Sequence, residues 1–203
     1  MSSKFAQVAF TPAVKRLQER DGSRSHYARG ESPGPGADSL GREELEFVRE
    51  RDSFYMATVS ETGWPYLQHR GGPKGFLMVL DAQTLAFADF RGNRQHVSEG
   101  NLSGNDRIAL ILVDYANRRR LKLLGRARVV DAAGEPKLAQ ALAEPGYEAR
   151  IERVMIIRVE AFDWNCPQHI TPRYSAKELG TVVEPLQARI RELEEQLRFA
   201  SSV

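Results

Sequence analysis

One segment of the sequence joins an apolar run to side chains that bind anions. The run Phe87-Ala88-Asp89-Phe90 leads into Arg91-Gly92-Asn93-Arg94-Gln95, where a glycine turn brings two arginines and two amides together. Guanidinium groups donate paired hydrogen bonds to phosphate oxygens, and free backbone N–H groups at the start of a helix also bind anions. A helix predicted to begin near Arg94 would make this segment a phosphate site.

A second segment with similar chemistry precedes it, His69-Arg70-Gly71-Gly72-Pro73-Lys74-Gly75, at the end of another apolar stretch. A short β-hairpin is predicted between the two segments, and this arrangement indicates a phosphorylated cofactor lying across a sheet. Neither segment has the glycine spacing of a P-loop or of a dinucleotide fingerprint. A plain turn with a surface charge remains the alternative at Arg94.

A third feature is a strand in which cations alternate with apolar residues. Leu121, Leu123, Gly125, Ala127 and Val129 share one face, whereas Arg120, Lys122, Arg126 and Arg128 share the other. The cationic face is either a solvated outer surface with acidic neighbours, or its first members reach a phosphate or an anionic ring. Nucleic-acid binding is disfavoured, because the net charge is only +2 and no aromatic residues are interleaved.

The cysteine and the histidines supply two further hypotheses. Cys166 and His169 follow the last predicted strand and could form a nucleophile–base pair, although a lone cysteine is more often buried for packing. The four histidines, His26, His69, His96 and His169, have no metal-ligand spacing, so no metal site is predicted. No catalytic side chain is assigned.

Composition defines the class of protein. The 203 residues are 41% hydrophobic and 28% charged, as in a globular domain with extensions. A single cysteine fits a reducing compartment. No apolar run is long enough to span a bilayer, and the first residues lack the apolar core of a signal peptide. We therefore expect a cytoplasmic protein that does not bind membranes.

The pattern of apolar residues changes from helical to strand-like near Ser53. Strands are predicted at 54–60, 64–69, 76–80, 84–88, 107–113, 119–130 and 154–162. Helices are predicted from Pro12, with Thr11 as N-cap, from Ser39, from Arg94 to Leu102 and from Glu135 to Ala143, whereas 21–38 is predicted to be an irregular loop. These elements indicate a mainly β fold, a six-stranded antiparallel split β-barrel with peripheral α-helices.

The C-terminal segment has a different pattern. Val183, Leu186, Ile190, Leu193 and Leu197 recur at spacings of three and four, as in the apolar seam of a coiled coil. Only about two heptads are visible, so the seam is expected to pack on its own domain or on a partner subunit. The predicted organisation is an N-terminal extension over 1–46, a barrel domain over 47–173 and a helical tail over 174–203.

Three of these motifs, in this order, resemble the FMN-binding split barrel of the pyridoxamine 5'-phosphate oxidase superfamily. They are Gly63-Trp64-Pro65 leading to His69–Pro73, then Phe87–Gln95, then Asn101–Val113 with Gly125-Arg126-Ala127. The tail Trp164–Arg173 is similar to that of an uncharacterised branch of the family. True pyridoxamine phosphate oxidases end with an Arg-Leu-His-Asp-Arg type segment that this chain lacks, so vitamin B6 oxidation is not expected.

The resemblance implies a homodimer with FMN at the subunit interface, or the related deazaflavin in its place. It implies that Arg70 and Lys74, with Asn93, Arg94 and Gln95, hold the flavin phosphate. Asp89 would lie near the ribityl chain, and Arg119 and Arg120 would approach the isoalloxazine. The predicted cofactor-binding set is completed by Gly71, Arg91, Trp164 and Gln168.

The function expected from the resemblance is a flavin-dependent oxidoreductase that acts on an unidentified small substrate. The alternative is a module that binds flavin, deazaflavin or haem without turnover. A cation close to the isoalloxazine would stabilise the anionic reduced flavin and raise its potential.

Overall fold

The structure, a computed structural model, describes residues 3–31, 36–143, 146–147, 149–164 and 166–200. Contacts divide the chain into two units, which we describe separately. The first unit comprises Met1–Asp114 and Arg119–Pro167, and the second comprises Tyr115–Arg118 and Gln168–Val203. Among the described residues, no helix is both long and apolar enough to cross a membrane. The predicted boundaries at residues 46 and 173 stay predictions.

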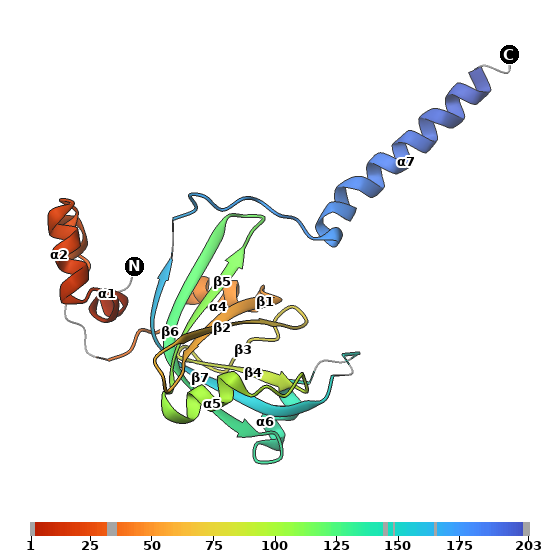
Figure 1. The fold of residues 1–203 in the computed structure, drawn as a ribbon. Helices are drawn as coiled ribbons and strands as arrows, with labels where there is room; N and C mark the ends of the chain where they lie inside the picture. The colour runs from red at the N-terminus through yellow and green to blue at the C-terminus, as the bar shows by residue number, and fades with distance from the viewer. Residues whose placement is uncertain (1–2, 32–35, 144–145, 148, 165, 201–203) are drawn as a thin grey trace. The chain divides into compact units, whose positions relative to one another are not determined.

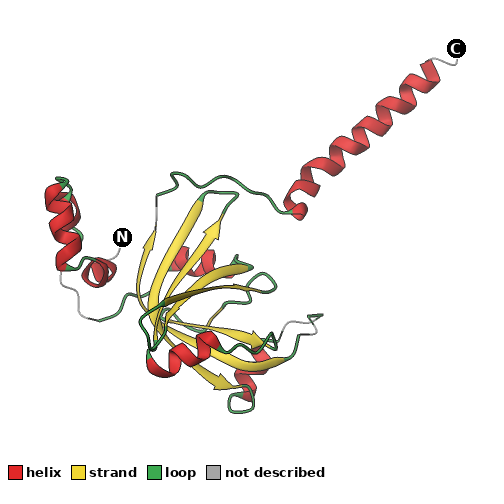
Figure 2. Ribbon diagram, in the orientation of Figure 1, coloured by secondary structure: helices red, strands yellow, loops and turns green. Residues whose placement is uncertain are grey.

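The first unit is built on one antiparallel sheet (Figures 1 and 2). Its strands are β1 (Ser53–Val59), β2 (Pro65–Gly71), β3 (Met78–Val79), β4 (Thr84–Phe90), β5 (Arg107–Asp114), β6 (Arg119–Asp131) and β7 (Ile151–Trp164). They pair in the order β2-β1-β5-β6-β7-β4-β3. The predicted mainly β, antiparallel class is confirmed.

The prediction of a six-stranded closed barrel is wrong in strand number and in closure. Seven strands are present, and among the described residues no ladder joins the terminal strands β2 and β3. Two features explain the open edge. β3 has only two residues, and β2 has no buried residue and carries Gln68, His69 and Arg70. Short or polar edge strands resist further pairing.

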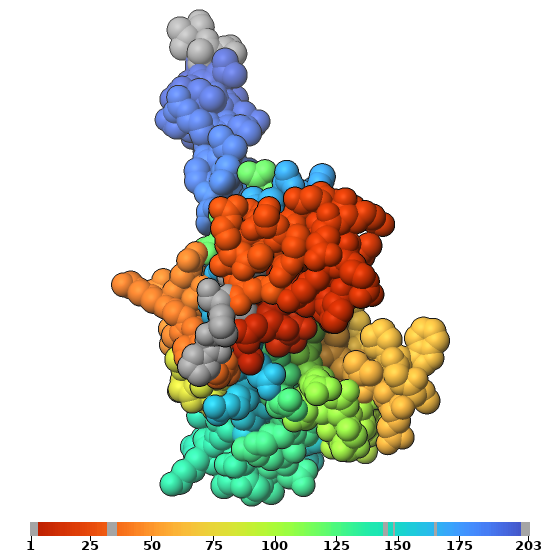
Figure 3. Space-filling model, turned by 90° about the vertical axis from the view of Figure 1, so that its left-hand side faces the viewer, coloured from red at the N-terminus to blue at the C-terminus, as the bar shows by residue number. Residues whose placement is uncertain are grey.

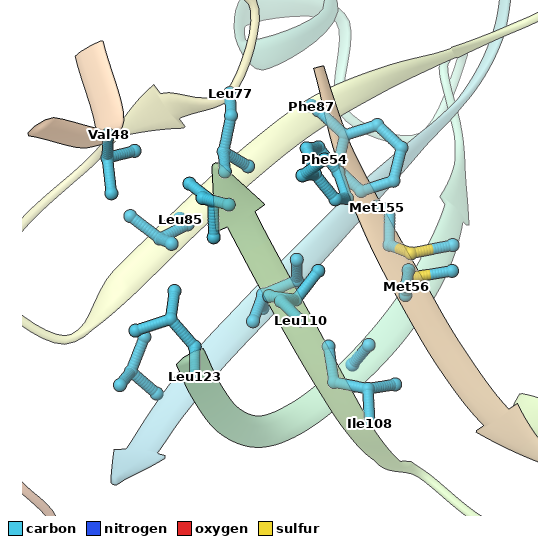
Figure 4. Packing of buried hydrophobic residues seen from close by; sticks show 14 of the residues in the cluster. Val48, Phe54, Met56, Leu77, Leu85, Phe87, Ile108, Leu110, Leu123 and Met155 are labelled. Atoms are coloured by element: carbon cyan, nitrogen blue, oxygen red, sulfur yellow. The ribbon is translucent and has the colours of Figure 1, made fainter. Parts of the chain in front are cut away.

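The sheet nevertheless curls strongly, because strands distant in the pairing order meet in the core. Phe54 on β1 packs edge-on against Phe87 on β4, with ring centroids 5.3 Å apart, although three strands separate β1 from β4 in the sheet. Phe76 stacks on Phe54 at 5.5 Å. Figure 4 shows these two aromatic rings, Phe54 and Phe87, beside Met56 and Met155 in the buried cluster. The apolar faces of β1 and β4 thus cover each other and exclude water.

The alternation predicted for β6 is confirmed. Leu121, Leu123 and Ala127 are buried, whereas Arg126 and Arg128 on the opposite face are exposed. The register with β7 shifts between Leu124 and Gly125, and a Cβ atom at Gly125 would lie 2.5 Å from the backbone oxygen of Arg158. A glycine is needed at this irregularity because the two backbones approach too closely for a side chain.

The helices agree with the sequence in part. They are α1 (Ser3–Ala9), α2 (Pro12–Arg20), α3 (Arg24–Ala28), α4 (Arg42–Arg49), α5 (Val97–Gly104), α6 (Pro136–Ala141) and α7 (Ala176–Ala200). The N-cap at Thr11 is confirmed, since its hydroxyl accepts a hydrogen bond from the Val14 N–H. The prediction of an irregular loop over 21–38 is wrong for Arg24–Ala28, which form α3. α1 packs against β7, and Figure 3 shows the N-terminal helices over the outside of the sheet.

Two helices begin later than predicted. α4 begins at Arg42 rather than near Ser39, because the Glu44 carboxylate accepts a hydrogen bond from the Gly41 N–H and caps the helix there. α5 begins at Val97 rather than at Arg94. The second shift changes the geometry of the predicted phosphate site, as described below.

We expect Gly125→Ala to lower the free energy of unfolding by about 1–3 kcal/mol, because the new methyl group overlaps the Arg158 backbone oxygen. Urea denaturation followed by circular dichroism measures this. Gly100→Ala is the matched control: it lies in α5 with no atom within 4 Å of its Cβ position and should be neutral or stabilising by about 0.5–1 kcal/mol. Equal losses in both variants would contradict the role assigned to Gly125.

Candidate anion-binding site

A largely buried group of three charged side chains joins three strands. The Asp89 carboxylate on β4 accepts a hydrogen bond from Arg70 Nη1 on β2 at 2.8 Å. It accepts two more from Arg153 on β7, from Nη2 at 2.8 Å and from Nε at 3.0 Å. The side chains of all three are no more than 16% exposed. We call this group the Asp89 cluster.

The register of the sheet explains one half of the cluster. Asp89 lies directly opposite Arg153 in the β4–β7 ladder, so their side chains leave the same face of the sheet as neighbours. Burial alone would lower the pKa of Arg153, but the hydrogen bonds that it donates to Asp89 and the charges of Asp89, Glu99 and Glu152 outweigh burial and raise that pKa. Arg153 therefore remains a cation next to the carboxylate.

The other half of the cluster leaves one hydrogen-bond donor unused. Arg70 is held by Asp89 through Nη1, and its guanidinium also lies over the Phe87 ring at 5.7 Å. Its Nε atom is buried and has no hydrogen-bond partner among the described residues. A buried donor without a partner costs free energy, which a bound anion would recover.

The segment between β4 and α5 has an unusual backbone. Arg94 and His96 have φ angles of 60° and 54°, in the left-handed region that non-glycine residues rarely adopt. The Asn93 side-chain oxygen accepts a hydrogen bond from the Gln95 N–H at 3.2 Å and closes a local turn. Such strain concentrates at functional sites. The prediction that a helix begins at Arg94 is wrong: Asn93, Arg94 and Gln95 form the turn that leads to its N-cap, His96.

This turn and the Asp89 cluster enclose a narrow cleft of about 80 Å³. Five of the predicted cofactor-binding residues line it: Arg70, Asp89, Asn93, Arg94 and Gln95. The first turn of α5 also contributes, through Val97, Ser98 and Glu99. Three arginines, counting Arg153, face two carboxylates, so the cleft has an excess of positive charge.

α5 is held in place by polar contacts with the first hairpin. Asn101 Nδ2 donates to the Thr58 hydroxyl at 2.9 Å, in a buried position on β1. The Ser98 hydroxyl donates to Gln68 Oε1 on β2 at 2.9 Å. These contacts set the start of α5, and so the turn before it, at a defined distance from Arg70.

Three further predicted residues do not line the cleft. Arg91 approaches Glu152, with Nε 3.7 Å from the carboxylate, and the same carboxylate is 3.4 Å from Arg94 Nη2. Gly71 pairs with Ser53 at the end of the β1–β2 ladder. Lys74 forms an ion pair with Glu50.

Two further predicted residues belong to a second cluster, which attaches α4 to the sheet. Trp164 Nε1 donates to Glu44 Oε1 at 2.7 Å, and the Trp164 ring packs edge-on against Phe47. The Arg119 guanidinium lies 4.5 Å from the Trp164 ring and 2.5 Å from the Glu43 carboxylate. In this chain both side chains already have packing roles, and neither lines the cleft.

The remaining predictions are distributed elsewhere. Arg120 Nε is buried without a partner among the described residues, but Arg120 does not line the cleft. Gln168 belongs to the second unit, Asn165 lies outside the described residues, and Cys166 is exposed. The nucleophile–base hypothesis for Cys166 and His169 stays a prediction.

Two of the four cations on the outer face of β6 are paired with acidic neighbours. Lys122 lies 3.0 Å from Asp163, and Arg126 bridges Asp106 at 2.8 Å and Glu160 at 2.6 Å. These pairs support the interpretation as a solvated outer face for Lys122 and Arg126. A larger hollow of about 570 Å³ lies beside them, lined in part by Arg126, Arg128 and Arg158. Among the described residues that line it, none has the buried, unpartnered donor that Arg70 supplies.

The sequence analysis missed Arg153, and with it the reason that Arg70 is fixed. Its position opposite Asp89 follows only from the β4–β7 register. It also missed Tyr66, Gln68 and Ser98, which line the cleft from β2 and α5. Tyr66, Gln68 and Arg70 share one face of the predicted hairpin strand, and this alternation was the only signal available for them.

The curled antiparallel sheet and its arginine-lined cleft define a mainly β protein. The family model described as pyridoxamine 5'-phosphate oxidase matches residues 40–165, which is more than half of the chain. The chain therefore belongs to the pyridoxamine 5'-phosphate oxidase family, as the sequence resemblance predicted. No curated protein matches it at a significant level.

Solved structures with similar folds are distant in sequence. HupZ from Group A Streptococcus is 18% identical, with a TM-score of 0.47 over 66% of this chain and 100% of that one. A protein related to general stress protein 26 from Clostridium acetobutylicum is 18% identical, with a TM-score of 0.46 over 67% and 94%. An F420 reductase is 22% identical, with a TM-score of 0.42 over 61% and 98%. The family assignment depends on the family match and not on these similarities.

We expect Asp89→Asn to lower the free energy of unfolding by about 3–5 kcal/mol, because it leaves Arg70 and Arg153 buried without their carboxylate. Urea denaturation measures the loss. The matched control is Glu160→Gln, which removes one of the two acidic partners of the more exposed Arg126 and should cost less than about 1 kcal/mol. A loss for Asp89→Asn no larger than that of the control would show that the Asp89 cluster does not hold the sheet.

Proposed function

We propose that the protein binds FMN as a homodimer and acts as a flavin-dependent oxidoreductase on a small substrate. The observation that carries the proposal is the buried Nε of Arg70, which has no hydrogen-bond partner among the described residues. Arg70 lines a cleft that Arg94 also lines. Membership of the pyridoxamine 5'-phosphate oxidase family supports a flavin or deazaflavin as the ligand.

The residues present fit the phosphate end of such a cofactor. Arg70 offers a donor that is fixed in direction by Asp89, and Arg94 offers a second guanidinium that is 56% exposed and engaged only by a 3.4 Å contact with Glu152 among the described residues. Asn93 and Gln95 add amide groups at the same turn. Charge-assisted hydrogen bonds of this kind are the stronger class in proteins.

The cleft is too small for a complete flavin. Sites that enclose whole cofactors have volumes of about 300–1,000 Å³, whereas this cleft has about 80 Å³. The isoalloxazine would therefore lie outside the cleft, against a surface that a second copy of the chain supplies. This requirement supports the proposed homodimer with the cofactor at the interface.

The bound flavin would supply hydride or electron transfer. The part of this chain is to bind and orient. Asp89 and Arg153 hold the Arg70 guanidinium in place, Arg70 and Arg94 balance the phosphate charge, and Asn101 with Ser98 keeps α5 beside the cleft. Arg120 remains a candidate for the isoalloxazine, because its buried Nε lacks a partner among the described residues.

We expect the purified protein to be yellow, or to become yellow on addition of FMN. Absorption spectroscopy and mass identification of the released chromophore measure this, and bleaching by NADH or NADPH would support turnover. Binding of FMN without bleaching by any donor would favour the non-catalytic module. A protein with no affinity for FMN or deazaflavin would refute the proposal.

We expect Arg94→Ala to raise the Kd for FMN by about 10- to 100-fold, because it removes a charge-assisted contact worth about 1.5–3 kcal/mol. Quenching of flavin fluorescence measures the Kd. The matched control is Arg107→Ala, an exposed arginine at the start of β5 that does not line the cleft. Because Arg94 makes only an exposed contact with Glu152, stability should change little. An unchanged Kd would refute the proposed phosphate position.

A further inference from the structure

The second unit contains a feature that the flavin site does not use, the apolar face of α7. α7 runs from Ala176 to Ala200 as one helix of 25 residues (Figure 1). Its start is fixed by a capping box: the Ser175 N–H donates to Glu178 Oε2 at 2.7 Å, and the Glu178 N–H donates to the Ser175 hydroxyl at 3.2 Å. The helix therefore begins one heptad before Val183, the first residue of the apolar pattern recognised in the sequence.

The extended helix has a complete heptad seam. The seam residues are Leu179, Val183, Leu186, Ile190, Leu193 and Leu197, which alternate between spacings of four and three. Each of them is between 42% and 67% exposed, and none of the described side chains of α7 is buried. A helix with this much exposed apolar surface gains most of its stability from a partner that covers it.

The residue types along the seam select the kind of partner. Val183, Ile190 and Leu197 occupy the first apolar position of their heptads, and two of these three are β-branched. Leu179, Leu186 and Leu193 occupy the second. β-Branched residues at the first position with leucine at the second favour two parallel strands. Pro185 lies inside the helix but not at a seam position, so its ring does not occupy the seam.

The charges beside the seam select the direction. In the heptad that contains Ile190 and Leu193, Arg189 directly precedes the first apolar residue and Glu194 directly follows the second. In a parallel pair in register, these two positions face each other across the seam, so Arg189 of each copy meets Glu194 of the other. In an antiparallel pair, the position of Arg189 faces the same heptad position of the other copy, and so does the position of Glu194. The attraction between Arg189 and Glu194 is then lost.

A lipid surface fits the helix less well. Membrane-surface helices carry an excess of Lys and Arg on the polar face. α7 has five acidic residues, Glu178, Glu184, Glu192, Glu194 and Glu195, against four basic ones, Lys177, Arg189, Arg191 and Arg198.

We propose that α7 pairs with α7 of a second copy of this chain as a parallel, in-register two-stranded coiled coil. Three heptads are close to the minimum for a coiled coil, so the pair gains from any other contact that keeps two copies together. The proposal concerns a surface distinct from the cleft, and its test requires no flavin.

Disulfide trapping in the full-length chain tests the pairing. In a Cys166→Ser background, Leu179→Cys and Leu193→Cys should each form intermolecular disulfides on the order of tenfold faster than Ala188→Cys, because seam positions meet their own copies and the outer position does not. Residues 179 and 193 are about 21 Å apart along a helix. An antiparallel pair could bring at most one of them to its own copy.

The outcomes separate the alternatives. Trapping at both seam positions supports the parallel pair. Trapping at only one of them contradicts the parallel direction. Rates at both seam positions no higher than at Ala188→Cys overturn the pairing itself, as would be seen if α7 covered its seam with its own chain or with a membrane.

A charge swap gives an independent readout of register. In the Leu193→Cys background, Arg189→Glu should slow trapping a few-fold, because it places two like charges across the seam. Adding Glu194→Arg should restore the rate. The matched control is Arg191→Glu, which changes the same charge outside the seam and should leave the rate unchanged. A swap that fails to restore the rate would overturn the proposed register.

Discussion

A single carboxylate connects the parts of this sheet that backbone hydrogen bonds leave apart. Asp89 on β4 binds Arg153 on the neighbouring strand β7, and it also binds Arg70 on β2, which lies at the other end of the strand order. The Arg70–Asp89 contact therefore spans the open side of a curled sheet. Two guanidinium groups neutralise one buried carboxylate, and the charge-assisted hydrogen bonds offset the cost of burying these ions.

The cleft exists because the sheet is held together in this way. If β2 continued the ladder to β3 or β4, backbone groups would fill the space beside Arg70. A polar edge strand and a two-residue β3 leave the edge unpaired instead. The strained turn at Arg94 and His96 then places further donors at the same opening. The side chains that hold the sheet and those that would hold an anion are thus partly the same.

Much of the fold was predictable from local patterns. The hairpins and the long β6 strand follow from alternation, because side chains of a strand leave opposite faces in turn. The start of α5 was not predictable, since it depends on the contacts of Asn101 and Ser98 with β1 and β2, which the sequence does not bring together. The closure of the barrel was predicted wrongly for the same reason, because pairing of the two edge strands depends on segments that are distant in the sequence. Arg119 and Trp164 were assigned to the cofactor, whereas the structure engages them with α4.

Three features could be read from the sequence alone: the antiparallel β class, the residue types of a candidate anion site and the apolar seam of the C-terminal helix. These are local properties, set by periodicity and by the chemistry of neighbouring side chains. Three others became visible only in the folded sheet: Arg153 completes the cluster, Arg70 has a buried donor without a partner among the described residues, and Lys74 lies outside the cleft. These features depend on which strands become neighbours when the sheet curls, and that register is set by packing of the whole core.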